Sequence, residues 1–356
     1  MSNFDPIMNI LLLPISFLYH IILSIRHKLY DWHLLKSKQF DQPVICVGNL
    51  ALGGTGKTPH VEYLIKLLSE QYRVCVVSRG YGRKTKGFQL ALENNSAETI
   101  GDEPMQYFNK FKDILVAVDE NRNRAIELMD TMDRPPELYL LDDAFQHRST
   151  QAGLNILLTA YDKLYSEDFL VPAGTLRDIR SAAKRADIIM VSKSPKELDA
   201  DRQAEVMAKL KPLPHQKVFF SYLDYEPLEP MNEAASRVSP DKMDSVLLFC
   251  GIANPKPPED RLSSQFKQLE TITFRDHHSY TEKDIEAVLK KYDELSGKQK
   301  IMVTTEKDFA RMTNSAYLCQ FDSVPLFVAP ISINIHQKEK FNKEILDYVR
   351  KDHQHS

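Results

Sequence analysis

The stretch "VGNLALGGTGKTPHVEYLIKLL" (residues 47–68) decides the fold of this chain, because a glycine-rich turn here joins an apolar run to a helical pattern. Backbone N–H groups at the start of such a helix bind phosphate. The usual phosphate loop reads G-x-x-x-x-G-K-[ST], and Ala51 stands where its first glycine belongs. The groups that cradle phosphate come later in the loop, so we interpret the stretch as a nucleotide-binding loop. The alternative is a simple strand–helix turn, which would not need Lys-Thr after three glycines.

The loop pattern gives its residues separate roles. Lys57 is expected to reach the β- and γ-phosphates of a nucleotide, and the Thr58 hydroxyl is expected to bind Mg²⁺. The glycines permit positive φ angles and a close approach of the backbone to the ligand. The predicted nucleotide contacts are Gly53, Gly54, Thr55, Gly56, Lys57 and Thr58.

Apolar runs alternate with helical patterns up to residue 193. The runs are continuous, which is typical of parallel strands covered on both faces. We therefore predict a P-loop NTPase-like α/β domain with a doubly wound parallel sheet. The predicted strands are 43–50, 73–79, 113–119, 137–143, 154–160 and 187–193, with helices over 59–71 and 120–132.

A second α/β block follows a polar, proline-rich region after residue 194. A strand-like run over 217–223 and a connector lead into it, so we place a domain boundary near residue 225. Strands are predicted in this block at 245–252, 269–274, 300–308 and 324–331, and helices at 257–269 and 281–295. The predicted division is a helical segment (1–38), a P-loop domain (39–225) and a smaller C-terminal α/β domain (226–356).

The composition is that of an ordinary globular protein, with 43% apolar and 27% charged residues. The net charge of −3 argues against a nucleic-acid partner. The four cysteines lie far apart, without metal-ligand or disulfide spacing, which favours a reduced, cytosolic environment.

The N-terminus is strongly apolar over residues 10–25, a run shorter than the roughly 20 residues that span a bilayer as a helix. No basic residue precedes it and no small-residue cleavage site follows it, which argues against a signal peptide. We predict a helix that lies in the membrane interface and faces the cytoplasm. The alternative is a helix packed on the protein's own core, and Pro14 should break or bend its first turns in either case. The polar residues would form one stripe on this helix: Asn9, Ser16, His20, Ser24, His27 and Asp31.

Two further stretches follow predicted strands of the first block. "LYLLDDAFQHR" places Asp142 and Asp143 at a strand end, the position of a Walker B carboxylate that organises Mg²⁺. "SRGYGRKTKG" (78–87) is a basic loop at the edge of the sheet where ligands bind. Arginine suits a substrate phosphate, although a solvated basic turn is the alternative. The stretch "VSKSPKEL" does not match the guanine motif N-K-x-D, so ATP is favoured as the nucleotide.

Two stretches offer residues for proton transfer. "TIGDEPMQYF" (99–108) opens a helix at Asp102, which by default would be its N-cap. His277 and His278 are adjacent in "FRDHHSYTEKD", which argues against a shared metal site. A histidine that reached across a cleft to an aspartate would be a workable base for a hydroxyl. Spacing alone does not establish that pairing.

These motifs, in this order, resemble those of the tetraacyldisaccharide 4'-kinases, the inner-membrane lipid A kinases of Gram-negative bacteria. The resemblance implies transfer of the γ-phosphate of ATP to the 4'-hydroxyl of a tetraacylated glucosamine disaccharide 1-phosphate, which gives lipid IVA. It also implies peripheral attachment to the cytoplasmic face of the inner membrane. The matching stretches are "VGNLALGGTGKTP", "SRGYGR", "GDEP", "LLDDAFQHR", "PAGTLRD", "ADIIMVSK", "DHHSY" and "TTEKD".

The resemblance implies roles for the acids and histidines. Asp102 corresponds to the proposed base, and a histidine of the DHH motif assists it. We assign that histidine to His277, with His278 as the second choice. Asp142 and Asp143 match the Walker B region.

The resemblance also concerns the arginines. Arg177 is implied as a phosphate or substrate contact, and we nominate Arg79 and Arg83 for the 1-phosphate of the lipid. The chain departs from the family at two positions. Ala144 stands where glycine commonly follows the paired acids, so the turn there must avoid glycine-only angles. Asp178 replaces a glutamate, which puts a direct role of that carboxylate in doubt.

Two other functions fit part of this pattern. A membrane-docked NTPase switch would explain the phosphate loop, the paired acids and the apolar helix, but not the basic loop or the Asp–His candidates. A kinase for a soluble substrate is at odds with the apolar N-terminus. Net phosphoryl transfer to an acceptor distinguishes a kinase from the switch.

Overall fold

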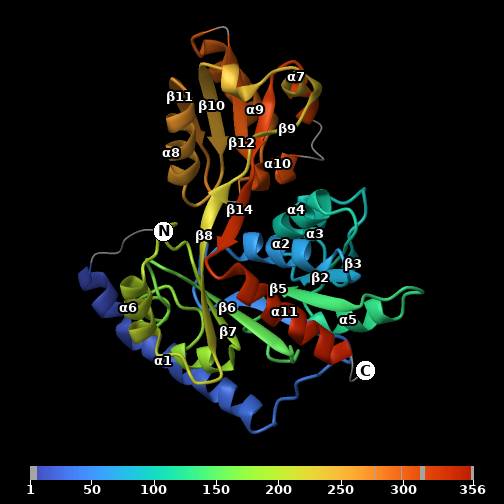
Figure 1. The fold of residues 1–356 in the computed structure, drawn as a ribbon, viewed down its shortest axis with the longest axis vertical. Helices are drawn as coiled ribbons and strands as arrows, with labels where there is room; N and C mark the ends of the chain where they lie inside the picture. Colours follow the sequence, from blue (N-terminus) through green and yellow to red (C-terminus); the bar gives the residue numbers. More distant parts are fainter. Residues whose placement is uncertain (1–5, 277, 298, 313–316, 354–356) are drawn as a thin grey trace.

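The structure is a computed structural model that describes residues 6–276, 278–297, 299–312 and 317–353. The strands of this part of the chain form two sheets, one of nine strands and one of five, and Figure 1 shows the smaller sheet above the larger one. The predicted α/β architecture, with a large sheet and a second, smaller one, is confirmed.

The larger sheet is parallel except at its two edges, where β14 and β3 run antiparallel to their neighbours. Each strand predicted before residue 194 is present in it. In spatial order its strands are β14 (Ile331–Ile335), β8 (Lys217–Tyr225), β7 (Ile188–Ser192), β6 (Leu154–Ala160), β1 (Val44–Asn49), β5 (Leu138–Asp142), β2 (Val74–Ser78), β4 (Leu115–Val118) and β3 (Gln89–Leu90).

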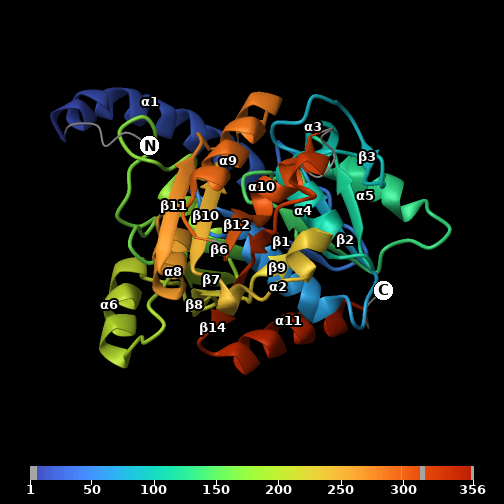
Figure 2. The ribbon, with the colours of Figure 1, turned by 90° about the horizontal axis from the view of Figure 1, so that it is seen from above.

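Helices cover both faces of this sheet, because successive residues of a strand point to opposite sides. Ile45 and Val47 of β1 belong to a core shared with α2 (Lys57–Leu68), α4 (Asp102–Lys110) and α11 (Lys338–His353). Val44 and Cys46 belong to the core shared with α1 (Pro6–Asp31), α5 (Arg122–Asp130) and α6 (Ala200–Leu210). Figure 2 shows α1 and α11 on opposite sides of the molecule. The short helices of this unit are α3 (Ala97–Ile100) and a 3-10 segment (Arg180–Arg185).

The smaller sheet is also covered on both faces. Its strands, in spatial order, are β11 (Gln268–Thr273), β10 (Ser245–Cys250), β12 (Lys300–Thr305), β13 (Leu326–Ala329) and β9 (Glu229–Pro230). Ile285 and Val288 of α9 (Glu282–Glu294) pack on one face, and Leu262 of α8 (Lys256–Gln265) packs on the other. The strand predicted over 300–308 ends at Thr305, where α10 (Glu306–Met312) begins. The remaining elements are α7 (Glu233–Ser236) and 3-10 segments at Pro240–Lys242 and Leu318–Phe321.

The C-terminal segment differs from the predicted division. β8 leads from the larger sheet toward the smaller one, and β14 returns antiparallel along it. Phe341, Ile345 and Val349 of α11 then join a core of the larger sheet. Residues 331–353 therefore belong to the larger sheet, and not to the smaller unit as the division at 226–356 predicts. The sequence pattern hides this return, because a strand that ends one sheet and a strand that joins another have the same apolar signature.

The N-terminal helix α1 is continuous with Pro14 inside it, so this proline does not break the helix. The described part of the chain contains no helix with the length and apolar character needed to cross a membrane. Ser16 and His27 of the polar stripe are buried against the protein, whereas Phe17 and Leu18 are more than half exposed. The helix packs on the protein through Ser16, Leu23 and His27, whereas His20 of the polar stripe is exposed and much of the apolar surface points outward.

Candidate active site

The predicted phosphate loop joins β1 to α2, and Gly56 is the N-cap of this helix. Gly53 and Gly56 have φ angles of 104° and 79°, in the region that favours glycine. Ala51 pairs with Leu176 in a short antiparallel bridge. The opening of the loop is therefore held extended by the segment around residue 176, and it needs no glycine at position 51.

The carbonyl oxygens of the loop are bound from the protein side. Ser192 Oγ donates to Thr55 O at 2.8 Å, and His60 Nδ1 donates to Gly56 O at 2.6 Å. Burial lowers the pKa of His60 to about 4, so the ring is neutral and its Nε2 accepts from Ser221 Oγ at 2.9 Å. The N–H of a trans peptide points away from its C=O. These bonds therefore direct N–H groups of the loop outward, where an anion would lie.

Lys57 begins α2 beside the paired acids, with its Nζ 3.8 Å from Asp143 Oδ1. Arg177 binds both oxygens of Asp143, with Nη1 at 3.0 Å from Oδ2, and its Nη2 also reaches Asn49 Oδ1 at 2.7 Å. Burial favours a higher pKa for Asp143, but Lys57 and Arg177 hold this pKa below its ordinary value. Asp143 has a φ of 49°, so this residue, and not Ala144, takes the left-handed position of the turn.

Asp142 ends β5 in the opposite electrostatic setting. Burial raises the pKa of Asp142 to about 7, and the negative charges of Asp143 and Glu103 add to the effect, which nearby lysines only partly offset. A bound cation would relieve this excess of negative charge. Thr58, predicted to bind the same cation, is buried in the first turn of α2. Within the described residues, no group of three or more His, Cys, Asp or Glu side chains is arranged to hold a metal by itself.

Asp102 is the first residue of α4, whose N-cap is Gly101, so the interpretation of Asp102 as an N-cap is wrong. Arg311 of α10 donates from Nε to Asp102 Oδ2 at 2.9 Å. Beside this pair, Lys307 Nζ lies 3.1 Å from Glu103 Oε1. The candidate base therefore lies where the two units meet.

The two candidate histidines differ in what the structure describes. His277 lies outside the described residues. His278 has Nε2 at 3.0 Å from Asp284 Oδ2, and its ring stacks on Phe274 with centroids 4.7 Å apart. These contacts of His278 are with its own unit.

The two nominated arginines of the basic loop, Arg79 and Arg83, have different surroundings. The Arg83 side chain is 2% exposed and donates to Glu120 at 2.6 Å and to Gly87 O at 2.7 Å. Arg79 is exposed, and its charge, together with burial, lowers the pKa of Arg122 on α5. Arg83 is thus used inside the protein, whereas Arg79 remains accessible to a substrate.

Sequence reasoning missed a cationic cluster near Asp142 and Asp143. It is formed by Arg26, Arg79, Arg122 and His147. Burial and the charges of Arg122, Arg26 and Arg79 lower the pKa of His147 to about 4. Arg122 Nε and His147 Nε2 are buried without a hydrogen-bond partner among the described residues. Such donors, gathered from several elements, suit an anion. His147 lies in the quoted "LLDDAFQHR", which was the available signal, whereas Arg122 only opens a predicted helix.

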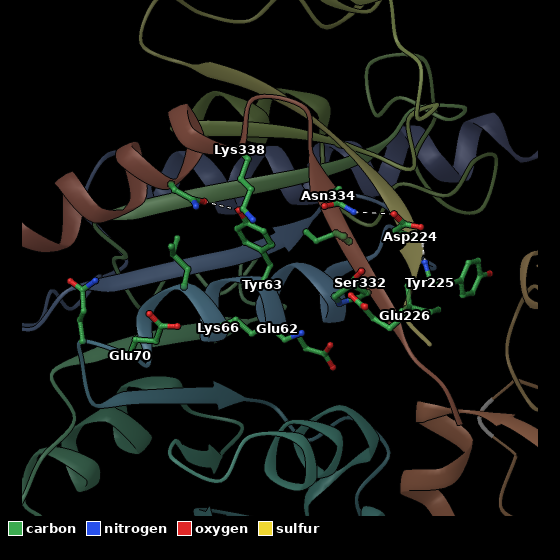
Figure 3. Close-up of a pocket in the computed structure, with 16 residues that line it drawn as sticks. Glu62, Tyr63, Lys66, Glu70, Asp224, Tyr225, Glu226, Ser332, Asn334 and Lys338 are labelled. Carbon is green, nitrogen blue, oxygen red and sulfur yellow. Dashed lines mark hydrogen bonds between the residues drawn. The ribbon is translucent and has the colours of Figure 1, made fainter. Parts of the chain in front are cut away.

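A separate polar pocket lies between α2 and β14, and Figure 3 shows its lining. Glu62 and Tyr63 line it from α2, and on the opposite side Asn334 Nδ2 of β14 donates to Asp224 Oδ2 of the neighbouring strand β8 at 3.3 Å. The described residues that line this pocket include none of the predicted site residues. The pocket lies beside α2 and the phosphate loop precedes it, so the two are distinct sites.

Comparison with known proteins shows what this chain is similar to. The model of the LpxK family, described as tetraacyldisaccharide-1-P 4'-kinase, matches residues 8–350. The chain belongs to the tetraacyldisaccharide 4'-kinase family. The tetraacyldisaccharide 4'-kinases of Flavobacterium johnsoniae and Bacteroides thetaiotaomicron are 45% and 40% identical to this chain, over 97% of its length in both cases and 99% and 94% of theirs.

A solved structure of a tetraacyldisaccharide 4'-kinase family member has a similar fold. LpxK from Aquifex aeolicus, in a crystal structure in complex with ATP, is 28% identical and has a TM-score of 0.74, covering 96% of this chain and 99% of that chain. The predicted family is confirmed, and with it kinase activity in lipid A biosynthesis. The alternative of a switch without phosphoryl transfer is thereby set aside.

Proposed function

We propose that this family member binds ATP on the loop before α2 and transfers the γ-phosphate to the 4'-hydroxyl of a tetraacyldisaccharide 1-phosphate. The observation that carries the proposal is the grouping of Lys57, Asp142 and Asp143 at the start of α2, with Lys57 Nζ 3.8 Å from Asp143 Oδ1. Loop N–H groups receive the phosphates, and Lys57 neutralises the charge of the transferring group. The apparent departure at Ala51 leaves these groups intact.

Mg²⁺ fits the electrostatics of this site. Burial raises the pKa of Asp142, and the negative charges of Asp143 and Glu103, which nearby lysines only partly offset, raise it further. Thr58 and Asp142 would hold the ion, which supplies positive charge at the phosphates. Asp143, also predicted as a ligand, already binds Lys57 and Arg177. We therefore assign to Asp143 and Arg177 the orientation of Lys57 and the loop.

Asp102 accepts the proton of the 4'-hydroxyl while the hydroxyl oxygen attacks the γ-phosphorus. The bond from that phosphorus to the bridging oxygen breaks, and ADP leaves with its electron pair. His277 keeps its predicted role as the assisting residue. The base contributes about 10²–10⁴-fold, and most of the remaining acceleration comes from positioning and charge neutralisation.

The 1-phosphate of the lipid binds the cationic cluster. Arg79 is exposed, and Arg122 and His147 present buried donors without a described partner. Arg79 keeps its predicted role, and Arg122 and His147 join it, whereas Arg83 binds Glu120 and Gly87 through Nη2 and is not assigned to the phosphate. Burial weakens the charged forms of Arg122 and His147, so an anion is the ligand that best satisfies both.

Helix α1 holds the enzyme in the interface of the cytoplasmic leaflet of the inner membrane. Leu11 and Phe17 are 69% and 66% exposed on its outward face. Burying such a side chain in lipid stabilises the bound state by about 1.5–3 kcal/mol. Arg26 and Lys28 lie near the C-terminal end of the helix, where their positive charges would attract anionic headgroups. The cationic cluster includes Arg26, so the helix and the phosphate site are adjacent.

Transfer of labelled γ-phosphate from ATP to tetraacyldisaccharide 1-phosphate in detergent micelles tests this function. The wild type should form a new phospholipid product, and Lys57→Ala should lower its rate by about 10²–10³-fold. Lys66→Ala, on an exposed turn of the same helix, is the control and should keep the rate. ATP hydrolysis without a lipid product would contradict the proposal. Unchanged kcat in Asp102→Ala would remove Asp102 from the mechanism.

A further inference from the structure

Arg311 lies on α10 of the smaller unit and contacts the candidate base on α4 of the larger one. Its Nε donates to Asp102 Oδ2 at 2.9 Å, and its side chain is 5% exposed. Figure 1 shows α10 directly above α4, at the junction of the two units. Exposed ion pairs contribute little and vary in geometry, whereas this arginine is buried in a fixed setting.

The guanidinium of Arg311 is held by its own unit. Nη1 donates to Gly251 O and to Asp308 Oδ1, both at 2.9 Å. Asp308 is fully buried and accepts from Gly251 N at 3.0 Å and from Thr305 Oγ1 at 2.6 Å. Gly251 follows β10 and Thr305 ends β12. The ends of these strands therefore set the direction in which the Arg311 Nε–H points.

Arg311 keeps its charge in this buried place. Burial lowers the pKa of Arg311, but the negative charges of Asp102 and Asp308 raise it more, so the net change is upward. Asp308 is oriented by the strand ends, and Asp102 is the carboxylate of the other unit that Arg311 binds. The arginine thus joins a rigid anchor in the smaller unit to a residue at the entrance of α4.

We propose that Arg311 is a positioning residue for phosphoryl transfer, which fixes the orientation in which the Asp102 carboxylate accepts the proton of the 4'-hydroxyl. The proposal rests on the proposed function of Asp102 as the base. A carboxylate side chain has several staggered rotamers, and a misplacement of about 1 Å can cost roughly 10²-fold in rate. Because the anchor belongs to the smaller unit, the bond from Arg311 to Asp102 exists only while α10 packs on α4.

Four variants of the full chain test the proposal in the transfer assay: Arg311→Ala, Arg311→Lys, Asp102→Asn and the double variant Asp102→Asn/Arg311→Ala. Arg311→Ala should lower kcat by about 10–100-fold and change KM for ATP by less than about threefold. Arg311→Lys keeps a positive charge beside Asp102 and should restore part of kcat. The double variant should be no slower than Asp102→Asn, because residues that act as a unit lose their effect together.

Lys110→Met is the control for the packing of α10 on α4, because it removes the Lys110–Glu306 ion pair between the same two helices, along with the Lys110–Glu62 pair outside α10. It should keep kcat within about threefold of the wild type. Thermal unfolding and ATP binding check that each variant is folded, and if Arg311→Ala does not fold, Arg311→Lys decides. Unchanged kcat in the Arg311 variants would overturn the proposal, as would an equal loss in Lys110→Met or a loss that adds to that of Asp102→Asn. Full kcat in Asp102→Asn would instead show that the base assignment itself is wrong.

Discussion

His27 of α1 and Asp178 are 151 residues apart in the chain, and His27 Nε2 lies 2.6 Å from Asp178 Oδ1. Asp178 is fully buried and also accepts from Ile179 N at 2.8 Å. Closer to the N-terminus of the helix, Ser16 Oγ donates to Leu170 O at 2.9 Å. Ser16 and His27 of the polar stripe thus attach α1 to the protein together with Leu23, and this attachment sets the direction of the exposed apolar face. The carboxylate whose direct catalytic role was in doubt has a structural one.

Asp178→Ala should destabilise the protein by about 3 kcal/mol, because it leaves His27 without its buried acceptor and removes the negative charge 3.8 Å from Arg185 Nη2. Burial already lowers the pKa of Arg185 to about 10, and Asp178 is the first charge that offsets this. Urea unfolding measures the loss, and limited proteolysis should show α1 released before the rest unfolds. Asp162→Ala, at an exposed position, is the control. Equal stability of Asp178→Ala and the wild type would contradict this account of the attachment.

Replacing Phe17, Leu18 and Ile22 together by serine should abolish binding to anionic vesicles and leave the fold intact. These side chains are 66%, 59% and 55% exposed, so lipid is the environment that would bury them. The loss of three apolar contacts should weaken vesicle binding by at least about 100-fold. Cosedimentation with vesicles measures this. The triple variant is a sharper test than removal of residues 1–30, which would also delete His27 and Ser16. Full binding by the triple variant would mean that another surface attaches the protein.

The larger sheet was predictable because its strands are buried on both faces and therefore read as continuous apolar runs. The run containing Val44 and Cys46 shows this, since alternate residues enter different cores. The path of α11 was not predictable, because nothing in its sequence tells which sheet its apolar stripe will meet. The burial of Ser16 and His27 on α1 was hidden for the same reason. Its partners, such as Asp178, lie far away in the sequence.

The phosphate loop was predictable because its residues are contiguous and each backbone group has a defined task. Lys57 and Asp143 come together as the strand order requires, since β1 pairs with β5. Arg311 gave no such signal, because its role depends on how α10 meets α4. The pairing of Arg83 with Glu120 gave no signal for a related reason. A basic loop does not reveal which of its arginines will find a carboxylate such as Glu120.

His60→Ala should weaken ATP binding about tenfold and change kcat at saturating ATP by less than about threefold, since it removes a hydrogen bond that orients the loop and no group that reacts. The neutral ring links Gly56 O to Ser221 Oγ, so its loss leaves Gly56 O with only the backbone N–H of residue 60, at 3.3 Å. Titration calorimetry with ATP measures the affinity. Ser221→Ala removes only the outer bond and should have a smaller effect. An unchanged Kd in His60→Ala would show that the loop holds its shape without this ring.

Glu62 predicts a pH dependence of stability. It is buried on α2, with Lys110 Nζ at 2.7 Å from its Oε2. Burial and the negative charge of Glu306 raise its pKa from 4.5 to about 7, against the effect of Lys110. The unfolded chain therefore ionises Glu62 at lower pH than the folded protein does. The stability that Glu62 contributes is fully present below pH 4.5 and is lost as the pH rises through about 7.

Glu62→Gln cannot ionise, so its stability relative to the wild type should increase between about pH 4.5 and pH 7. The expected change in the difference between their free energies of unfolding is roughly 1–3 kcal/mol. Urea unfolding of both proteins at pH 5 and pH 8 measures it. Glu70→Gln is the control, because Glu70 is exposed and lies just after α2. Figure 3 labels Glu70 and Glu62 in the lining of the pocket between α2 and β14. If the difference between Glu62→Gln and the wild type is the same at both pH values, then Lys110 keeps Glu62 ionised in the folded protein throughout this range.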